Sequence, residues 1–441
     1  MPEAVLSVLR LRDLPPDALR RRLERSAGAI FNETMRAYAR QVLDDVARDG
    51  DVAVAAYTAK WDGVAIAPEA FQVGVQEVEA AHRAIDDELR RALEAAMARA
   101  VRYNRWLRPP AMSLEEIEPG IVVGIRYQPC RSAGLYIPSG KGTFPSTLIT
   151  MGAPAAVAGV ERIAVVVPPR PDGSVDAAVL VAADLLGIRQ IFRCNGAAGI
   201  AALAVGTARI PKTDVVVGPG NPVIAAVQLA AAAYGARPLV VLGPTEAVVL
   251  ADETADPSLL ALDLLNEAEH GADSAVILLA TDPAIAEAAA ARLPAFLDRL
   301  PEPRRTFALT ALSDLGGLFV AADLDEAVAW IDAYAPEHLQ LAVRDPLAVA
   351  ARIRHAGEIL VGQGTPFAAA NYAIGVPAAL PTGGAAVASS GVTVLSFLKA
   401  TSLASLSPEG LRRIAPEVVR LGRHEGFPAH VQAITAREER P

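Results

Sequence analysis

Cysteine is nearly absent from this chain of 441 residues, which contains only Cys130 and Cys194. Two thiols so far apart exclude a disulfide framework and a Cys-x-x-Cys site, and they fit a reducing compartment. Long hydrophobic runs are also missing, because stretches such as residues 223–233 are too short to span a bilayer. The first residues lack the basic and apolar segments of a secretory signal. The sequence therefore predicts a cytoplasmic protein that does not associate with membranes.

Aromatic residues make up only 5% of the chain, although hydrophobic residues reach 52% because alanine dominates. An excess of positive charge is lacking as well. The formal net charge of −9 argues against nucleic acid or an anionic membrane as the main partner. A chain of this length can bury a substantial core and form two or more domains. These features predict a globular protein.

From residue 121 onward, apolar runs rich in β-branched residues alternate with alanine- and leucine-rich stretches of helical character. This alternation predicts right-handed crossovers and a largely parallel, doubly wound sheet. In such sheets ligands bind beyond the carboxyl ends of the strands. The expected strands are residues 121–125, 163–167, 191–192, 215–217, 239–242 and 275–279. The expected helices are residues 37–46, 75–107, 177–186, 200–205, 222–234, 258–268 and 408–437.

Histidine is scarce as well, and three of the six histidines stand in acidic surroundings at distant places. Histidine serves both as metal ligand and as near-neutral acid or base, so these stretches predict a composite active site. Each stretch also has a structural alternative. The first can cap a helix end, the second can open a helix, and the third can be a surface residue of the last helix. The stretches are Glu267-Ala-Glu-His270, Ala335-Pro-Glu-His-Leu-Gln340 and Glu425-Gly-Phe-Pro-Ala-His430.

The usual glycine-rich nucleotide fingerprints are missing, since there is no Gly-x-Gly-x-x-Gly and no phosphate-binding loop of the right spacing. Gly218-Pro-Gly-Asn221 leads from an apolar strand into a helix, whose N-terminus attracts phosphate, although the same sequence also makes ordinary turns. Glu267 and His270 stand three apart on a predicted helix and leave the same face. That geometry suits a shared zinc ion with further ligands from elsewhere in the chain.

Short motifs of high combined specificity are spread along the chain from about residue 30 to the C-terminus. They are Leu135-Tyr-Ile-Pro-Ser-Gly140, Pro145-Ser-Thr147, Ala153-Pro-Ala-Ala-Val-Ala-Gly159, Val167-Pro-Pro169, Gly196-Ala197 with Ile200-Ala-Ala-Leu203, Gly218-Pro-Gly-Asn221, Ala268-Glu-His270, Pro336-Glu-His338, Leu380-Pro-Thr382, and Glu425 with His430. Together they resemble the histidinol dehydrogenase family. The resemblance implies a zinc- and NAD-dependent alcohol dehydrogenase that oxidises L-histidinol to L-histidine through an aldehyde, in two hydride transfers.

The resemblance also implies roles for individual residues. His338 is expected to take the alcohol proton, and Glu337 to activate the water that hydrates the aldehyde. The amino alcohol substrate is expected to contact His338, Thr245 and Glu425 together with the zinc ligands. The implied zinc ligands are Glu267, His270, Asn371 and His430. The implied NAD contacts are Tyr136, Ala198 and Asn221.

Four positions depart from the family pattern. Glu267 stands where the family has Gln, and Asn371 where it has Asp, which predicts a transposed zinc site of unchanged charge. Ala198 replaces a cofactor-contacting Gln and so removes a hydrogen bond worth on the order of 1 kcal/mol, which weakens NAD binding roughly tenfold or less. Ala378 replaces an active-site histidine. The last change indicates a substrate that lacks the group recognised by that histidine.

The expected fold is α/β, with two Rossmann-like doubly wound domains, a helical N-terminal arm and a helical C-terminal tail. The expected parts are residues 1–30 for the arm, 31–130 with 250–382 for the first domain, 131–249 for the cofactor-contacting second domain, and 383–441 for the tail. The resemblance implies a homodimer in which this tail completes the partner's site. Two other functions are open: a paralogue that oxidises another small polar alcohol, and a catalytically silent homologue that binds a ligand. Retention of Glu337 and His338 argues against the silent homologue.

Overall fold

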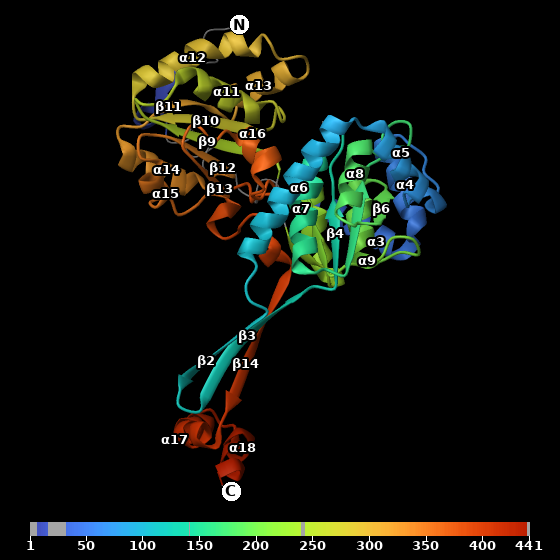
Figure 1. Ribbon diagram of the computed structural model, residues 1–441, viewed down its shortest axis with the longest axis vertical. Helices are drawn as coiled ribbons and strands as arrows, with labels where there is room; N and C mark the ends of the chain where they lie inside the picture. Colours follow the sequence, from blue (N-terminus) through green and yellow to red (C-terminus); the bar gives the residue numbers. More distant parts are fainter. Residues whose placement is uncertain (1–6, 16–31, 141, 240–242, 439–441) are drawn as a thin grey trace.

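Two parallel β-sheets with helices on both faces lie side by side, and a narrow arm extends away from them (Figure 1). The computed structural model describes residues 7–15, 32–140, 142–239 and 243–438. Within this part of the chain, no helix is long and apolar enough to cross a membrane. The α/β class with parallel sheets predicted from the sequence is confirmed.

The first sheet has six strands in the order β1-β11-β10-β9-β12-β13, and all neighbouring strands are parallel. Alternate residues of β9 bury against opposite layers: Ala247 and Val249 contact α11 to α13, whereas Val248 and Leu250 contact α14 and α15. The strands are β1 (Val8–Arg10), β9 (Glu246–Ala251), β10 (Ala275–Ala280), β11 (Gly317–Val320), β12 (His338–Ala342) and β13 (Glu358–Val361). The helices are α11 (Pro257–Ala268), α12 (Pro283–Leu297), α13 (Arg304–Ser313), α14 (Leu324–Tyr334) and α15 (Pro346–Ala350).

The second sheet has five parallel strands in the order β6-β5-β4-β7-β8. Val165 and Val167 face α6 to α8, and Ala164 and Val166 face α3, α4, α9 and α10. The strands are β4 (Ser132–Tyr136), β5 (Arg162–Val167), β6 (Gln190–Arg193), β7 (Val215–Val217) and β8 (Arg237–Leu239). The helices are α3 (Glu33–Asp49), α4 (Asp51–Asp62), α5 (Val75–Ala84), α6 (Asp87–Leu107), α7 (Pro145–Ala158), α8 (Ala177–Leu185), α9 (Gly196–Val205) and α10 (Pro222–Ala230).

The arm is an antiparallel three-stranded sheet that carries two helices at its far end (Figure 1). Several large apolar side chains are exposed along it, among them Leu114, Ile117 and Phe427. Its elements are β2 (Met112–Glu118), β3 (Ile121–Pro129), β14 (Leu398–Leu406), α17 (Pro408–His424) and α18 (Pro428–Glu438). The remaining short elements are η2 (Leu11–Asp13), η3 (Pro68–Ala70), η4 (Ala231–Tyr234), α16 (Phe367–Ala369), η5 (Ala370–Ile374), η6 (Ala385–Val387) and η7 (Val394–Phe397).

Three expectations from the sequence differ from the structure in the type of element. Residues 121–125 belong to antiparallel β3, because their partner is β14 and not a strand of a parallel sheet. The predicted N-terminal helix contains strand β1 and the short turn η2 within residues 7–15, and its other residues lie outside those described. A three-residue edge strand is too short to show a periodic pattern. The tail begins with β14 before its helices, and residues 240–242 of one predicted strand are outside the described part.

The long predicted helices are each divided in two. Residues 75–107 form α5 and α6, because Ile85 is extended and the Asp86 side chain caps α6 by accepting from the Leu89 N–H. Residues 408–437 form α17 and α18 around Gly426, whose φ is 77°. The packing of α3 to α6 also differs from the predicted grouping of residues 31–130 with 250–382. Their apolar side chains contact α7 to α10, which cover the five-stranded sheet.

Candidate active site

A cavity of about 460 Å³ lies where the two parallel sheets face each other. The five-stranded sheet contributes the carboxyl end of β4 and the loop after β7. The six-stranded sheet contributes the amino-terminal ends of its strands, because the cavity residues Thr245, Ser274 and Glu337 immediately precede β9, β10 and β12. The cavity therefore lies at the carboxyl ends of the strands in one sheet, as expected for a ligand site, and at the amino-terminal ends of the strands in the other. Polar lining residues are Tyr136, Ser139, Ser146, Thr147, Asn221, Thr245, Glu267, His270, Asp273, Ser274, Glu337, His338, Asn371 and Tyr372.

Glu337 and His338 reach the cavity from the turn between α14 and β12. Ala335, at the end of α14, has a φ of 51° and is the only non-glycine residue with positive φ in the described chain. Such strain persists where the surroundings fix the backbone, often at functional sites. The Glu337 carboxylate accepts the backbone N–H of Glu246 at 3.0 Å. The alternative that Pro336 and Glu337 open a helix is wrong, because β12 begins at His338.

The Glu337 and His338 side chains are buried and form a coupled acid–base pair. His338 Nε2 lies 3.7 Å from Glu337 Oε1, and His338 Nδ1 is hydrogen-bonded to Glu358 Oε1. Burial raises the pKa of the Glu337 carboxyl to about 8, against the lowering effect of His338. Burial lowers the pKa of His338, but the carboxylates of Glu337, Glu267 and Glu358 outweigh it and raise that pKa to about 10. Strongly shifted groups that meet in a cavity indicate a functional site.

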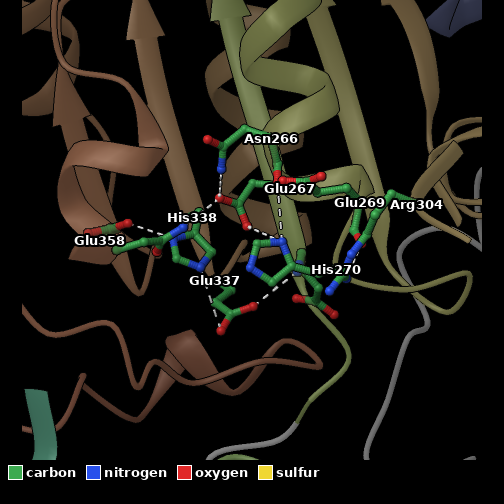
Figure 2. A network of polar contacts seen from close by, with 10 residues as sticks. Asn266, Glu267, Glu269, His270, Arg304, Glu337, His338 and Glu358 are labelled. Carbon is green, nitrogen blue, oxygen red and sulfur yellow. Dashed lines mark hydrogen bonds and ion pairs between the residues drawn. The ribbon is translucent and has the colours of Figure 1, made fainter. Parts of the chain in front are cut away.

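Glu267 and His270 stand at the end of α11 beside this pair (Figure 2). Glu267 is fully buried, and its Oε1 accepts the side-chain amides of Asn266 and Asn371 at 2.7 and 2.9 Å. Its Oε2 has no hydrogen-bond partner among the described residues and lies 3.7 Å from His270 Nδ1. His270 Nδ1 can donate to the carbonyl oxygen of Asn266, which lies 3.2 Å away, and this leaves Nε2 available.

These atoms fit a metal ion. A buried carboxylate oxygen without a hydrogen bond, an imidazole nitrogen and the Asn371 amide oxygen are donor types that zinc accepts. In the described chain, no group of three or more His, Cys, Asp or Glu side chains is arranged so that it could hold a metal ion by itself. Of the four predicted zinc ligands, only Glu267 and His270 are both of these residue types and located in the cavity of this chain. Two such side chains do not make a group of three.

The predicted cofactor contacts fall into two groups. Tyr136 and Asn221 line the cavity beside β4 and β7, between which the order of strands reverses, and this is where nucleotides bind in doubly wound sheets. Gly218 must be glycine here, because a Cβ would lie 2.4 Å from the Tyr136 carbonyl oxygen. Ala198 does not line the cavity, because it is fully buried in α9 with its N–H facing the Asn195 side chain.

The third histidine stretch is not part of this chain's cavity. Glu425 directly follows α17 and His430 lies in the first turn of α18; both are exposed, and Figure 1 shows these two helices at the far end of the arm. The structure therefore brings together two of the three stretches, along with Thr245 and Asn371. The sequence analysis missed Glu358, although a charged residue that opens the apolar strand Glu358-Ile-Leu-Val361 is a signal that could have found it.

A buried acid–base pair shares one cavity with a loop whose following helix N-terminus can bind a phosphate group. This combination is typical of an enzyme that acts on a small molecule with a cofactor. The chain belongs to the histidinol dehydrogenase family, because residues 26–438 match that family's model. It is thus an oxidoreductase of the class that acts on CH–OH groups with NAD.

Individual relatives cover nearly the whole chain. Histidinol dehydrogenase of Synechocystis is 40% identical over 433 residues, which are 98% of this chain and 99% of that protein. A protein of Colwellia psychrerythraea named histidinol dehydrogenase homolog is 38% identical over 98% of this chain and 96% of its own. The crystal structure of histidinol dehydrogenase from Elizabethkingia anophelis has a TM-score of 0.90 at 31% identity and covers 96% of both chains.

Proposed function

We propose that this protein oxidises L-histidinol through the aldehyde to L-histidine, a reaction of histidine biosynthesis, with NAD as hydride acceptor and zinc at the substrate. The observation that carries the proposal is the meeting of Glu337-His338 with Glu267 and His270 in one cavity. Three acidic side chains, Glu267, Asp273 and Glu337, line that cavity. No Lys or Arg stands among its described lining residues, so it favours an alcohol that carries an ammonium group.

Glu267, His270 and Asn371 are the cavity's ligands for zinc, which when bound acts as a Lewis acid that anchors the amino alcohol. The Asn371 side chain donates its amide N–H to Glu267, so its oxygen is the atom left for the ion. This arrangement supports the transposed site, in which carboxylate and amide have exchanged positions. The total charge of the zinc ligands is unchanged by that exchange.

The proton chemistry falls to the pair beside those ligands. His338 accepts the alcohol proton at Nε2, because Nδ1 is occupied by Glu358. Glu337 then activates the water that hydrates the aldehyde. The Glu267 carboxylate is one of those that raise the pKa of His338, and a cation held there would offset it, so that the imidazole would lie nearer its free-base form. Tyr136 and Asn221 would hold NAD, which would supply the acceptor for the hydride of the substrate carbon.

We assign His430 of a second copy as the fourth zinc ligand. Glu425 of that copy supplies a carboxylate that contacts the substrate. Both residues are exposed on an arm that reaches away from its own cavity, and the arm bears exposed apolar side chains that a second copy can cover. We therefore infer a homodimer with two shared sites. Both cysteines are free and buried, which fits the proposed cytoplasmic location.

A second candidate is a paralogue that oxidises another small polar alcohol. Ala378 lines the cavity where the family has a histidine, so the wall at that point offers a methyl group and no hydrogen bond. Relatives named as homologs, such as that of Colwellia psychrerythraea, share this level of identity. The two candidates differ in substrate and share the same residues for proton transfer.

The test is NADH formation by the zinc-loaded protein with histidinol and with a panel of small polar alcohols, alongside metal analysis. We expect about one zinc per chain and two NADH per histidinol consumed. Turnover of another alcohol without turnover of histidinol selects the paralogue. A protein that binds neither zinc nor NAD and turns over no alcohol contradicts both candidates.

A further inference from the structure

Glu358 is tied to the Glu337-His338 turn through the backbone. It opens β13 directly opposite His338, which opens β12, and its N–H donates to the Glu337 carbonyl at 3.0 Å. The Gly357 N–H donates to the Pro336 carbonyl at 2.9 Å. A Cβ at Gly357 would stand 2.5 Å from the Glu337 carbonyl oxygen, so only glycine permits this approach. The position of Glu358 relative to His338 is therefore fixed by main-chain contacts.

The two side chains meet in a buried environment. The exposed fraction is 8% for the Glu358 side chain and 5% for that of His338. Glu358 Oε1 bonds His338 Nδ1, and its Oε2 has no hydrogen-bond partner among the described residues. Phe367 packs with a ring-centroid distance of 5.9 Å, nearly perpendicular to the imidazole. Figure 2 shows the imidazole between Glu358 on one side and the Glu267–His270 pair on the other.

A buried carboxylate that is kept without a full set of hydrogen bonds costs stability, so a purely structural role is a poor account of it. A carboxylate accepts only, and an imidazole bonded to it must carry its hydrogen on Nδ1. The lone pair of a neutral ring then stands on Nε2, the nitrogen nearer Glu337. The same carboxylate stabilises the imidazolium that forms when Nε2 gains a proton.

We propose that Glu358 is a positioning residue of the dehydrogenase reaction, which holds His338 in its Nδ1–H tautomer and stabilises the imidazolium formed during alcohol oxidation. The proposal rests on the proposed role of His338 as base. In the step concerned, the alcohol O–H proton passes to His338 Nε2, and the carbon gives its hydride to NAD. The Nδ1–H proton stays on its nitrogen throughout, so Glu358 need not change its protonation state.

The first test compares Glu358→Gln and Glu358→Ala in the zinc-loaded enzyme. Gln keeps an acceptor oxygen without the charge, whereas Ala removes both. We expect kcat to fall roughly 10–100-fold in the Ala variant and at least as much in the Gln variant, whose amide N–H can hold the opposite tautomer, with KM and zinc content within about threefold of the parent. Asp45→Asn is the matched control. It removes a carboxylate that accepts the Tyr57 hydroxyl at 2.8 Å outside the cavity, and it should leave kcat unchanged.

The second test needs no turnover and follows the ring nitrogens of His338 by NMR of ¹⁵N-histidine-labelled protein, with the signal assigned by its loss in His338→Asn. In the parent, Nδ1 should remain an N–H nitrogen at every pH, because both the charged ring and the bonded tautomer carry that hydrogen. In Glu358→Ala the neutral ring should average over both tautomers.

A parent ring that already averages, or an Ala variant with unchanged kcat, overturns the proposal. If the parent oxidises no alcohol while its Nδ1 keeps the hydrogen, the proposed function fails and the role of Glu358 in orienting the ring stands. If the Ala variant does not fold, the Gln variant and the parent spectrum decide the question.

Discussion

The cavity and the arm hold the two groups of residues that we propose for one shared site, and these groups are in opposite physical states. In the cavity, Glu267, Glu337 and His338 are buried and held by hydrogen bonds from three different elements. On the arm, Glu425 and His430 are exposed on neighbouring helices. The cavity half is thus positioned by the fold of a single chain. The arm half lies outside the cavity of its own chain and is exposed.

This difference shows what the proposed sharing of a site between two chains would require of each half. Groups that exchange protons need a dry and rigid setting, since their pKa values depend on burial. A ligand delivered from outside needs only a long, stiff carrier, and an antiparallel sheet followed by two helices is such a carrier. The following predictions probe first the cavity half, then the link between its ligands, and then residues of neither half.

The largest effect is expected at the base. His338→Asn removes the group that we propose as acceptor of the alcohol proton, and kcat should fall by roughly 10²–10⁴-fold. The matched control is His424→Asn, which changes an exposed histidine of the arm that has no proposed role. Steady-state NADH formation measures both. Equal activity of the two variants would remove His338 from the mechanism and leave the cavity without its base.

A smaller effect is expected from the transposed ligands. Glu267→Gln removes the only cavity carboxylate assigned to zinc, and Asn371→Asp adds a second, so each single variant should change the zinc affinity. The double variant restores one carboxylate and should regain much of the lost affinity. Competition with a chelator measures the four proteins of this double-mutant cycle. Strictly additive effects would show that the two positions do not share an ion.

The smallest effect is expected from the cysteines. Burial raises the pKa of both thiols, and neither lines the cavity, so no thiolate can serve the aldehyde step. The Cys130→Ala/Cys194→Ala variant should therefore keep kcat within about threefold of the parent enzyme, after correction for folded protein by thermal unfolding. A decrease in kcat as large as that of His338→Asn would indicate that the aldehyde is oxidised through a thiol adduct and not through the hydrate.

The sequence predicted those parts of the molecule that leave a local pattern. Valine-rich runs such as residues 163–167 and 215–217 became strands of a parallel sheet, and the pairing of Glu267 with His270 followed from helical spacing. Contacts between distant segments leave no such pattern. The pairing of β3 with β14 joins remote parts of the chain, and Glu358 meets His338 only because two strand starts align. The cavity lies at the amino-terminal ends of the strands of the six-stranded sheet, and this position depends on how the two sheets face each other.

The most direct test of the shared site is subunit complementation. His270→Ala disables the cavity half and His430→Ala the arm half, so each protein alone should be inactive. After equal mixing and verified subunit exchange, half of the dimers are mixed, and each mixed dimer holds one intact site of two. The account predicts that about a quarter of the parent activity returns. A mixture that stays inactive after exchange would show that His430 does not complete a partner's cavity, and would contradict the shared site.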